Sequence, residues 1–152
     1  RMGIPGLITL LERISSAWEK NRQNLIDSGN RITGIFEVYR PQAGEISEKT
    51  ADQAFNEFRC SFDSMYGGFG SAPKFPGPHN LFFLLRYWYT RKDNSALEMV
   101  TKTLDSMYRG GIYDHIGFGF SRYSTDRKWL VPHFEKMLYD NALLAIAYLE
   151  AY

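Results

Sequence analysis

Three features are scarce in this sequence. With one cysteine among 152 residues, Cys60, the chain cannot form an internal disulfide, and it has no CxxC pair for zinc or redox chemistry. Its longest apolar run, residues 81–85, is far too short to span a bilayer, and no cleavage-site pattern follows the apolar residues near the N-terminus. The 18 basic and 17 acidic residues are scattered, without a basic block that could follow a phosphate backbone. We therefore expect no membrane and no nucleic acid as partner, and a reducing, cytoplasmic location.

Apolar and aromatic residues are plentiful by contrast. Hydrophobic residues make up 44% of the chain, which suits one domain with its own core. The aromatic content of 16% fits either a flat-faced ligand such as a sugar or a core rich in Phe and Tyr. Cys60 lies in the helical stretch AFNEFRCSFDSMY, where we expect it to be a small buried side chain.

Apolar residues recur mostly every three or four positions, which predicts an all-α fold. The expected helices cover about 6–29, 48–65, a segment from about Pro78, 95–108, and a segment from about Pro132 to the end. Ser47 and Asn94 are the expected caps of the second and fourth helices. Residues 34–47, GIFEVYRPQAGEIS, are expected to form a connector with extended character.

An internal repeat relates two parts of the chain. FDSMYGGF at 62–69 resembles LDSMYRGGI at 104–112, with Asp105 placed 42 residues after Asp63. A period of this size fits a helical hairpin that must stack on its neighbours to bury its apolar faces. We therefore expect the two helices to end at the same side of the fold. The loops that begin at their Gly-Gly pairs, 67–77 and 110–131, would then line a single opening.

The segment 110–141 has the composition of a functional surface. It combines paired glycines, aromatics, two histidines and both charge signs, and a polar segment of this length in a compact domain is usually functional or disordered. Proton abstraction beside a carbonyl needs a base that titrates near neutrality, which His115 or His133 could supply. Hydrolysis of a glycosidic bond needs two carboxylates instead, available from Asp114, Asp126, Glu135 and Asp140. Spacing does not choose between these chemistries, and each histidine could equally be a structural hydrogen-bonding residue.

Binding groups and their structural alternatives are also present. Arg122 and Asp126 could bind hydroxyl groups beside an aromatic platform, or the loop could simply fold on its own aromatic cluster; the aromatics concerned are Tyr113, Phe118, Phe120, Tyr123 and Trp129. GGFGSAPKFPGPHN at 67–80 lacks the pattern of a phosphate-binding loop, so it is either a rigid turn or a source of ligand contacts from Lys74, Phe75 or His79.

No metal or cofactor is expected. On a helix, His133 and Glu135 would point to different sides, which excludes the HExxH zinc geometry. Lys136 and Asp140, four residues apart, have the spacing of an ion pair on a helix surface.

Two segments carry a family resemblance. GGFGSAPKFP at 67–76 and GGIYDHIGFGFSRYSTDRKWLVPHFEKMLYDNA at 110–142 resemble the spermatogenesis-associated protein family and its bacterial and archaeal relatives. The likeness runs from about Tyr66 to the end, and PGLITLLERISSAWEKNRQNL near the start is similar to the helix that follows the family's thioredoxin-like domain. The resemblance implies a fragment of a two-part protein. Residues 1–46 would be a linker helix and connector after an absent thioredoxin-like domain, and residues 47–152 the opening hairpins of a six-hairpin, glycosidase-like (α/α)6 toroid.

Similar toroids include N-acylglucosamine and cellobiose epimerases, in which histidines move a proton, and glycoside hydrolases, in which carboxylates act. By fold analogy we expect a carbohydrate-active or carbohydrate-binding protein that takes a sugar-like molecule. The alternative is a noncatalytic scaffold that supports the thioredoxin-like redox domain of the full-length chain. A toroid fragment leaves helix faces uncovered, so dimerisation is a further expectation.

These arguments give a set of candidate site residues. The catalytic candidates are His115, His133 and Glu135; the ligand-binding candidates are Lys74, Phe75, Asp114, Arg122, Tyr123, Asp126, Trp129 and Tyr139. Many members of the family carry histidine where this chain has Ser121 and glycine where it has Phe118, so no base is expected at position 121.

Overall fold

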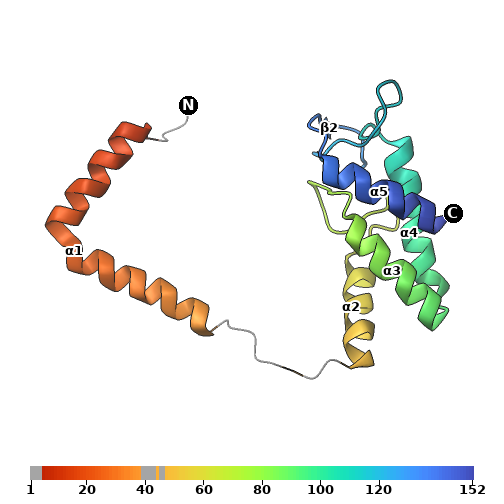
Figure 1. The fold of residues 1–152 in the computed structure, drawn as a ribbon, viewed down its shortest axis with the longest axis horizontal. Coiled ribbons are helices and arrows are strands. Elements are labelled where there is room, and N and C mark those ends of the chain that lie inside the picture. Colours follow the sequence, from red (N-terminus) through yellow and green to blue (C-terminus); the bar gives the residue numbers. More distant parts are fainter. Residues whose placement is uncertain (1–4, 39–43, 45–46) are drawn as a thin grey trace. The chain divides into compact units, whose positions relative to one another are not determined.

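A computed structural model describes residues 5–38, 44 and 47–152 (Figure 1). The chain divides into two compact units, Arg1–Glu45 and Ile46–Tyr152, each of which is described separately. The expected connector 34–47 is helical up to Val38, and most of its remainder lies outside the described residues.

The described residues of the first unit form one helix, α1 (Leu7–Val38), which has a kink at Asn21 where φ is −138°. It extends nine residues past the predicted end at 29 and includes Gly29 and Gly34. A helix tolerates an isolated glycine at a cost of about 1 kcal/mol, so these glycines do not end it. Many large apolar side chains of α1 are exposed. No described helix is long and apolar enough to cross a membrane.

The second unit is built from four helices and one small hairpin. The helices are α2 (Glu48–Ser61), α3 (Pro78–Arg91), α4 (Asn94–Arg109) and α5 (Leu138–Ala151). Strands β1 (Tyr123–Ser124) and β2 (Pro132–His133) pair antiparallel, with Tyr123 opposite His133. The predicted all-α fold class is confirmed.

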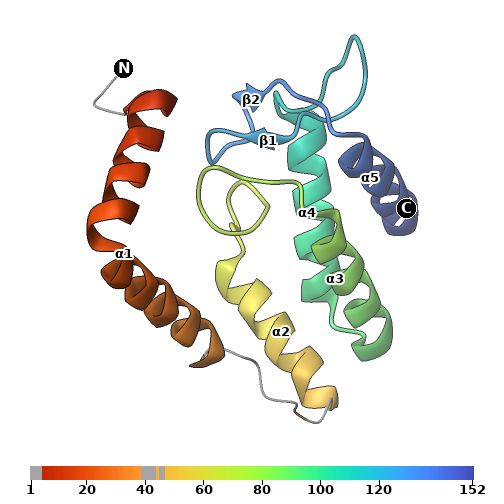
Figure 2. The same ribbon diagram turned by 60° about the vertical axis from the view of Figure 1, so that its left-hand side comes forward.

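The core lies where α3, α4 and α5 pack together (Figure 2). Helix α4 buries one side at the three- and four-residue spacing expected of an amphipathic helix, through Ala96, Met99, Val100, Thr103, Leu104 and Met107. Leu81, Leu84 and Leu85 of α3 and Leu144 and Ala147 of α5 complete the centre. Helix α2 joins this core through Phe55, whose ring stacks on Tyr87 of α3 at 4.2 Å between centroids.

Several helix boundaries differ from the prediction. Ser47 is the N-cap of α2 as expected, but α4 is capped by Asp93 rather than Asn94, since the Asp93 carboxylate accepts from the Ser95 amide. Cys60 is exposed, so the prediction of a buried cysteine is wrong. The reason is its position on α2, beside the stripe that carries Phe55 rather than within it.

The first copy of the repeat is a turn, whereas the second lies mainly inside α4. Helix α2 ends at Ser61, and a turn follows in which Gly67 N donates to Asp63 O (2.7 Å) and Asp63 N donates to Gly68 O (2.9 Å). The predicted helix end at residue 65 is therefore wrong. Even so, α2 and α4 run in the same general direction, and the loops that follow them gather at one end of the unit (Figures 1 and 2).

Residues 132–137 are extended, so the prediction that the last helix begins near Pro132 is also wrong. Strand β2 pairs with β1, and Arg122 N donates to Glu135 O at 2.7 Å, which holds this segment against the hairpin. His133 and Glu135 consequently precede α5. The predicted helical pair of Lys136 with Asp140 is replaced by an ion pair of Lys136 with Asp114 (2.7 Å).

Candidate functional site

A cluster of charges around two buried side chains, Asp63 and Lys74, joins the two loops. The Asp63 carboxylate accepts from Lys74 Nζ at 2.7 Å and from Arg127 Nε at 2.6 Å and a terminal Arg127 nitrogen at 2.9 Å. Lys74 Nζ also donates to Gly67 O at 2.6 Å, and the side chains of Lys74 and Asp63 are 0% and 2% exposed. Lys74 and Ser124 exchange two backbone hydrogen bonds of 2.8 Å. Lys74 therefore holds the loops together and presents no surface to a ligand.

The charge on Asp63 is stabilised by its partners. Its pKa lies well below the usual range, chiefly because Arg127 donates hydrogen bonds to the carboxylate; burial opposes this shift, and the ammonium of Lys74 reinforces it. The backbone amides of Met65 and Tyr66 also donate to the carboxylate, each at 3.2 Å. Asp63 is thus an ionised structural residue and not a general acid.

Trp129 fills the space between the two Gly-Gly pairs. Its side chain is fully buried, and its indole N–H donates to Tyr66 O at 2.9 Å. A Cβ on Gly68 would lie 2.5 Å from the indole ring, and one on Gly110 would lie 2.6 Å from Trp129 O. Gly68 in the first copy of the repeat and Gly110 in the second therefore need to be glycine, because the backbone at both positions lies against this tryptophan.

Gly68→Ala and Gly70→Ala form a matched pair of tests. Both glycines have positive φ, 78° and 73°, but a Cβ on Gly70 would meet nothing within 4 Å. We expect Gly70→Ala to cost about 1 kcal/mol from backbone strain alone. Gly68→Ala should lose about 1–3 kcal/mol more from overpacking against Trp129. Chemical denaturation of the two variants measures the difference, and equal losses would contradict the packing argument.

Asp126 closes the turn that carries Trp129. Its carboxylate accepts from the backbone amides of Lys128 (2.5 Å) and Val131 (2.6 Å) and from Ser124 Oγ (3.2 Å). Burial alone would raise the pKa of Asp126, but these backbone hydrogen bonds lower it overall. Side chains of Lys74, Asp126 and Trp129 thus make internal contacts of the two loops.

A second group of predicted residues forms a surface cluster at the hairpin. The ring of Tyr123 lies 4.8 Å from that of Phe75 and stacks on His133 at 4.7 Å between centroids. Arg122 pairs with Glu135 at 3.0 Å, and His133 Nδ1 lies 3.9 Å from the same carboxylate. Tyr139, in the first turn of α5, is also exposed.

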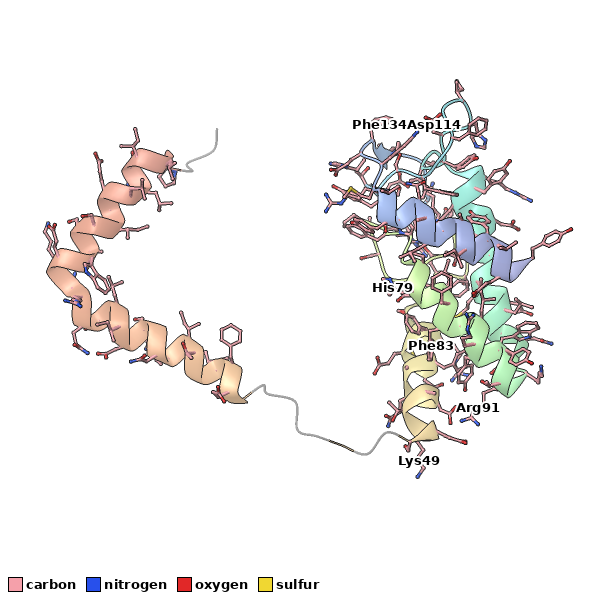
Figure 3. All side chains as sticks on the ribbon, in the orientation of Figure 1. Lys49, His79, Phe83, Arg91, Asp114 and Phe134 are labelled. Atoms are coloured by element: carbon pink, nitrogen blue, oxygen red, sulfur yellow. The ribbon has the colours of Figure 1, made fainter. Side chains whose placement is uncertain are left out.

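Asp140 lies near this cluster and has a different electrostatic character. Its pKa is raised, because desolvation by burial outweighs the opposing electrostatic effects of Arg122 and His79. His79 lies in the first turn of α3 (Figure 3). Asp140 was only one of four carboxylates in the sequence-based pool, and nothing in its spacing distinguished it.

The third group lies in a pocket of about 520 Å³ built around His115. Its lining residues are Gly111, Tyr113, Asp114, His115, Ile116, Ser121, Pro132, Phe134 and Lys136. The pKa of Asp114 is lowered to about 2, first by the hydrogen bond from Lys136 and then by the amides of Gly117 and Ile116. Figure 3 shows Asp114 and Phe134 at the loop end of the unit. Asp114 is therefore an ionised acceptor at neutral pH.

The two candidate histidines lie on opposite sides of the extended segment. Side chains alternate along an extended chain, and residues 132, 134 and 136 line the pocket with His115 whereas His133 and Glu135 do not. His133 belongs to the surface cluster through its stacking on Tyr123. The structure thus separates His115 from the other two catalytic candidates.

The residues that sequence reasoning missed are mainly partners from distant positions. Asp63 and Arg127 are 64 residues apart, and Thr103 Oγ1 accepts from Gly68 N at 2.9 Å. Asn141 Oδ1 accepts from Phe120 N at 2.6 Å and secures the 110–121 loop to α5. Only Asp63 carried a signal, since it stands in the repeated motif. Among the described residues, no group of three or more His, Cys, Asp or Glu side chains is placed to hold a metal ion.

Fold and site together define a mainly helical protein in which the loops of the second unit form an aromatic and charged surface at one end. No family model matches the chain. It is 42% identical, over 97% of its length, to spermatogenesis-associated protein 20 of Homo sapiens, and 40% identical over the same share to that of Rattus norvegicus. An uncharacterised protein of Caenorhabditis elegans is 39% identical over 96% of the chain.

The chain spans about one fifth of the length of these relatives, 20% of the mammalian proteins and 21% of the nematode protein. The chain is thus similar to one segment of the mammalian spermatogenesis-associated protein 20, and the family resemblance predicted from residues 67–76 and 110–142 is confirmed.

Proposed function

We propose that the pocket around His115 binds a carbohydrate-like small molecule and that His115 acts there as an acid/base. The observation that carries the proposal is the pocket itself. Its volume of about 520 Å³ falls within the usual range for small-molecule sites, and a titratable histidine lies on its wall. Among the catalytic candidates, only His115 lines this cavity.

The other lining groups suit a ligand rich in hydroxyls. Tyr113 offers an aromatic face, and its ring lies 4.9 Å from that of His115 in an edge-to-face arrangement. Asp114 accepts hydrogen bonds and Lys136 donates them, while Ser121 adds a hydroxyl at the wall. An aromatic face combined with a few fixed polar groups is the usual composition of such sites.

Between the two chemistries considered, the geometry favours epimerase-like proton transfer. A glycosidase needs one carboxyl group that is protonated and a second that faces it. Asp114 is held ionised by Lys136, and Glu135 lies on the other side of the extended segment. Histidine is a common general base in proteins, so His115 is suited to removing a proton beside an opened sugar aldehyde. The resemblance to a glycosidase-like toroid supports the same ligand class by analogy.

Matched histidine variants test the proposal. The chain is incubated with free hexoses and N-acetylhexosamines in deuterated water, and exchange at C2 is followed by NMR alongside saturation-transfer binding. We expect His115→Gln to lower the exchange rate by about 10²–10⁴-fold, as for loss of a general base, and His133→Gln to leave it nearly unchanged.

Three other outcomes would contradict part or all of this proposal. Loss of exchange only in His133→Gln would move the site to the surface cluster. Binding without exchange would contradict the acid/base role and leave a binding function. Absence of binding to every sugar would contradict the carbohydrate proposal and favour the noncatalytic scaffold of a thioredoxin-like domain.

A further inference from the structure

A second pocket lies between the two copies of the repeat and shares no lining residue with the pocket of His115. It has a volume of about 280 Å³. Its lining residues are Met65, Tyr66, Lys102, Asp105, Ser106, Arg109, Gly110, Lys128 and Leu130. The two copies of the repeated DSMY sequence therefore both contribute to it, Met65 and Tyr66 from the first copy and Asp105 and Ser106 from the second.

Three cationic side chains, Lys102, Arg109 and Lys128, line this pocket. Lys102, Ser106 and Arg109 follow one another at steps of four and three residues, which places them on one face of α4. Lys128 comes from the 110–137 loop, and its Nζ lies 5.6 Å from the centroid of the Tyr66 ring. A phosphate or similar anion is bound most effectively by several cations held around one point.

Half of the cations of the second unit are already paired, whereas Lys49, Arg59 and Lys92, like the three cations of the pocket, form no ion pair among the described residues. Lys74, Lys136 and four arginines each form an ion pair with a carboxylate, the arginines being Arg86, Arg91, Arg122 and Arg127. Within the described residues, Lys102, Arg109 and Lys128 have no such pair. Their charge is therefore available to a ligand.

The remaining polar groups of the pocket point to more than a bare anion. Ser106 and Tyr66 offer hydroxyl groups, and the Asp105 carboxylate accepts hydrogen bonds but repels a phosphate. Three cations against one carboxylate leave a net positive pocket, and the acceptor is suited to the hydroxyl groups of an attached organic part. The C-terminal end of α4 carries a partial negative charge that repels an anion slightly. The cationic side chains must therefore supply the attraction.

We propose that this pocket binds the phosphate group of a phosphorylated, hydroxyl-bearing small molecule. Arg109, Lys102 and Lys128 bind the phosphate, and Asp105 accepts from a hydroxyl group of the organic part. This inference is independent of the proposed role of His115, because the two pockets have no residue in common.

Isothermal titration of the full 152-residue chain with glucose 6-phosphate, inorganic phosphate and glucose tests the site. We expect saturable binding that is tightest for glucose 6-phosphate. Arg109→Gln and Lys128→Gln should each weaken it about tenfold, the usual effect of removing one charge-assisted hydrogen bond. Asp105→Asn should act in the opposite direction on inorganic phosphate and strengthen its binding. His115→Gln should leave the affinity for inorganic phosphate unchanged, which separates this site from the proposed sugar pocket.

Lys49→Gln and Arg59→Gln are the matched controls. They remove the same charge outside the pocket, and we expect changes below about twofold at physiological ionic strength because exposed distant charges are screened. Lys128 extends from a turn held by backbone contacts to Asp126, so Lys128→Gln keeps the test valid if Arg109→Gln fails to fold. Equal weakening in pocket and control variants, or no saturable binding of glucose 6-phosphate, would overturn the proposal.

Discussion

Asp63→Ala is expected to lower the free energy of unfolding of residues 46–152 by about 3–5 kcal/mol, the usual effect of removing one partner of a buried ion pair. The reason is the environment of Lys74. Its ammonium is fully buried, and without the carboxylate it retains only Gly67 O as hydrogen-bond acceptor. Arg127 would lose its partner as well. Urea denaturation followed by far-UV circular dichroism measures the loss.

Two further variants separate this effect from simple loss of a surface charge. Glu150→Ala removes the partner of Arg86 in an exposed pair and should cost at most about 1 kcal/mol. Combining Asp63→Ala with Lys74→Met should recover part of the loss, because no buried charge is then left unpaired. If the double variant is less stable than Asp63→Ala, the buried charge is not the cause.

The pH dependence of Asp63 has a definite sign. Since its pKa is lower in the folded chain than in the unfolded chain, its stabilisation is fully present above about pH 4 and is lost as the pH falls toward the folded value. Asp63→Asn should therefore show a smaller loss of stability between neutral pH and strong acid than the unchanged chain. An identical acid dependence in both would contradict this assignment.

Trp129→Ala should have an effect of similar size, about 3–5 kcal/mol, which is usual for removing a large buried aromatic side chain. The indole is fully buried against Gly68 and Gly110, and its N–H donates to Tyr66 O. The substitution therefore leaves both a cavity and an unpaired carbonyl. We also expect faster hydrogen exchange at Gly68 and Ile112, whose backbones lie against this residue.

Trp18→Ala is the matched control for this substitution. Trp18 is 46% exposed on α1, in the other unit, and its removal should change the stability of residues 46–152 by less than about 0.5 kcal/mol. A Trp129→Ala chain as stable as the control would show that the indole is not the packing centre of the loops.

The helical part of the fold was largely predictable because its signals are local. The spacing of apolar residues identified all five helices, and Ser47 and Pro78 marked two helix starts correctly. The errors occur where distant partners determine the backbone. Residues 132–137 are extended because β2 pairs with β1, and α2 ends early because its next residues form a turn around Asp63.

The candidate site was predictable as a region but not as a set of roles. Motifs at 67–76 and 110–142 located the two loops, and the paired glycines placed them together. From the sequence, His115 and His133 were catalytic candidates, and Lys74 and Trp129 were ligand-binding candidates. The structure buries Lys74 and Trp129, places His115 in a pocket and stacks His133 on Tyr123.

By itself, the sequence determined the all-helical class, the family resemblance and the position of the loops, because each depends on residues close together in the chain. Only the tertiary structure decided which charged and aromatic loop residues stabilise the fold and which line pockets. Burial and ion pairing depend on partners such as Asp63 and Arg127, which lie 64 positions apart and meet only when the loops pack. Local sequence patterns do not predict such contacts, because the same residue types are suited to stabilising the fold and to lining a pocket.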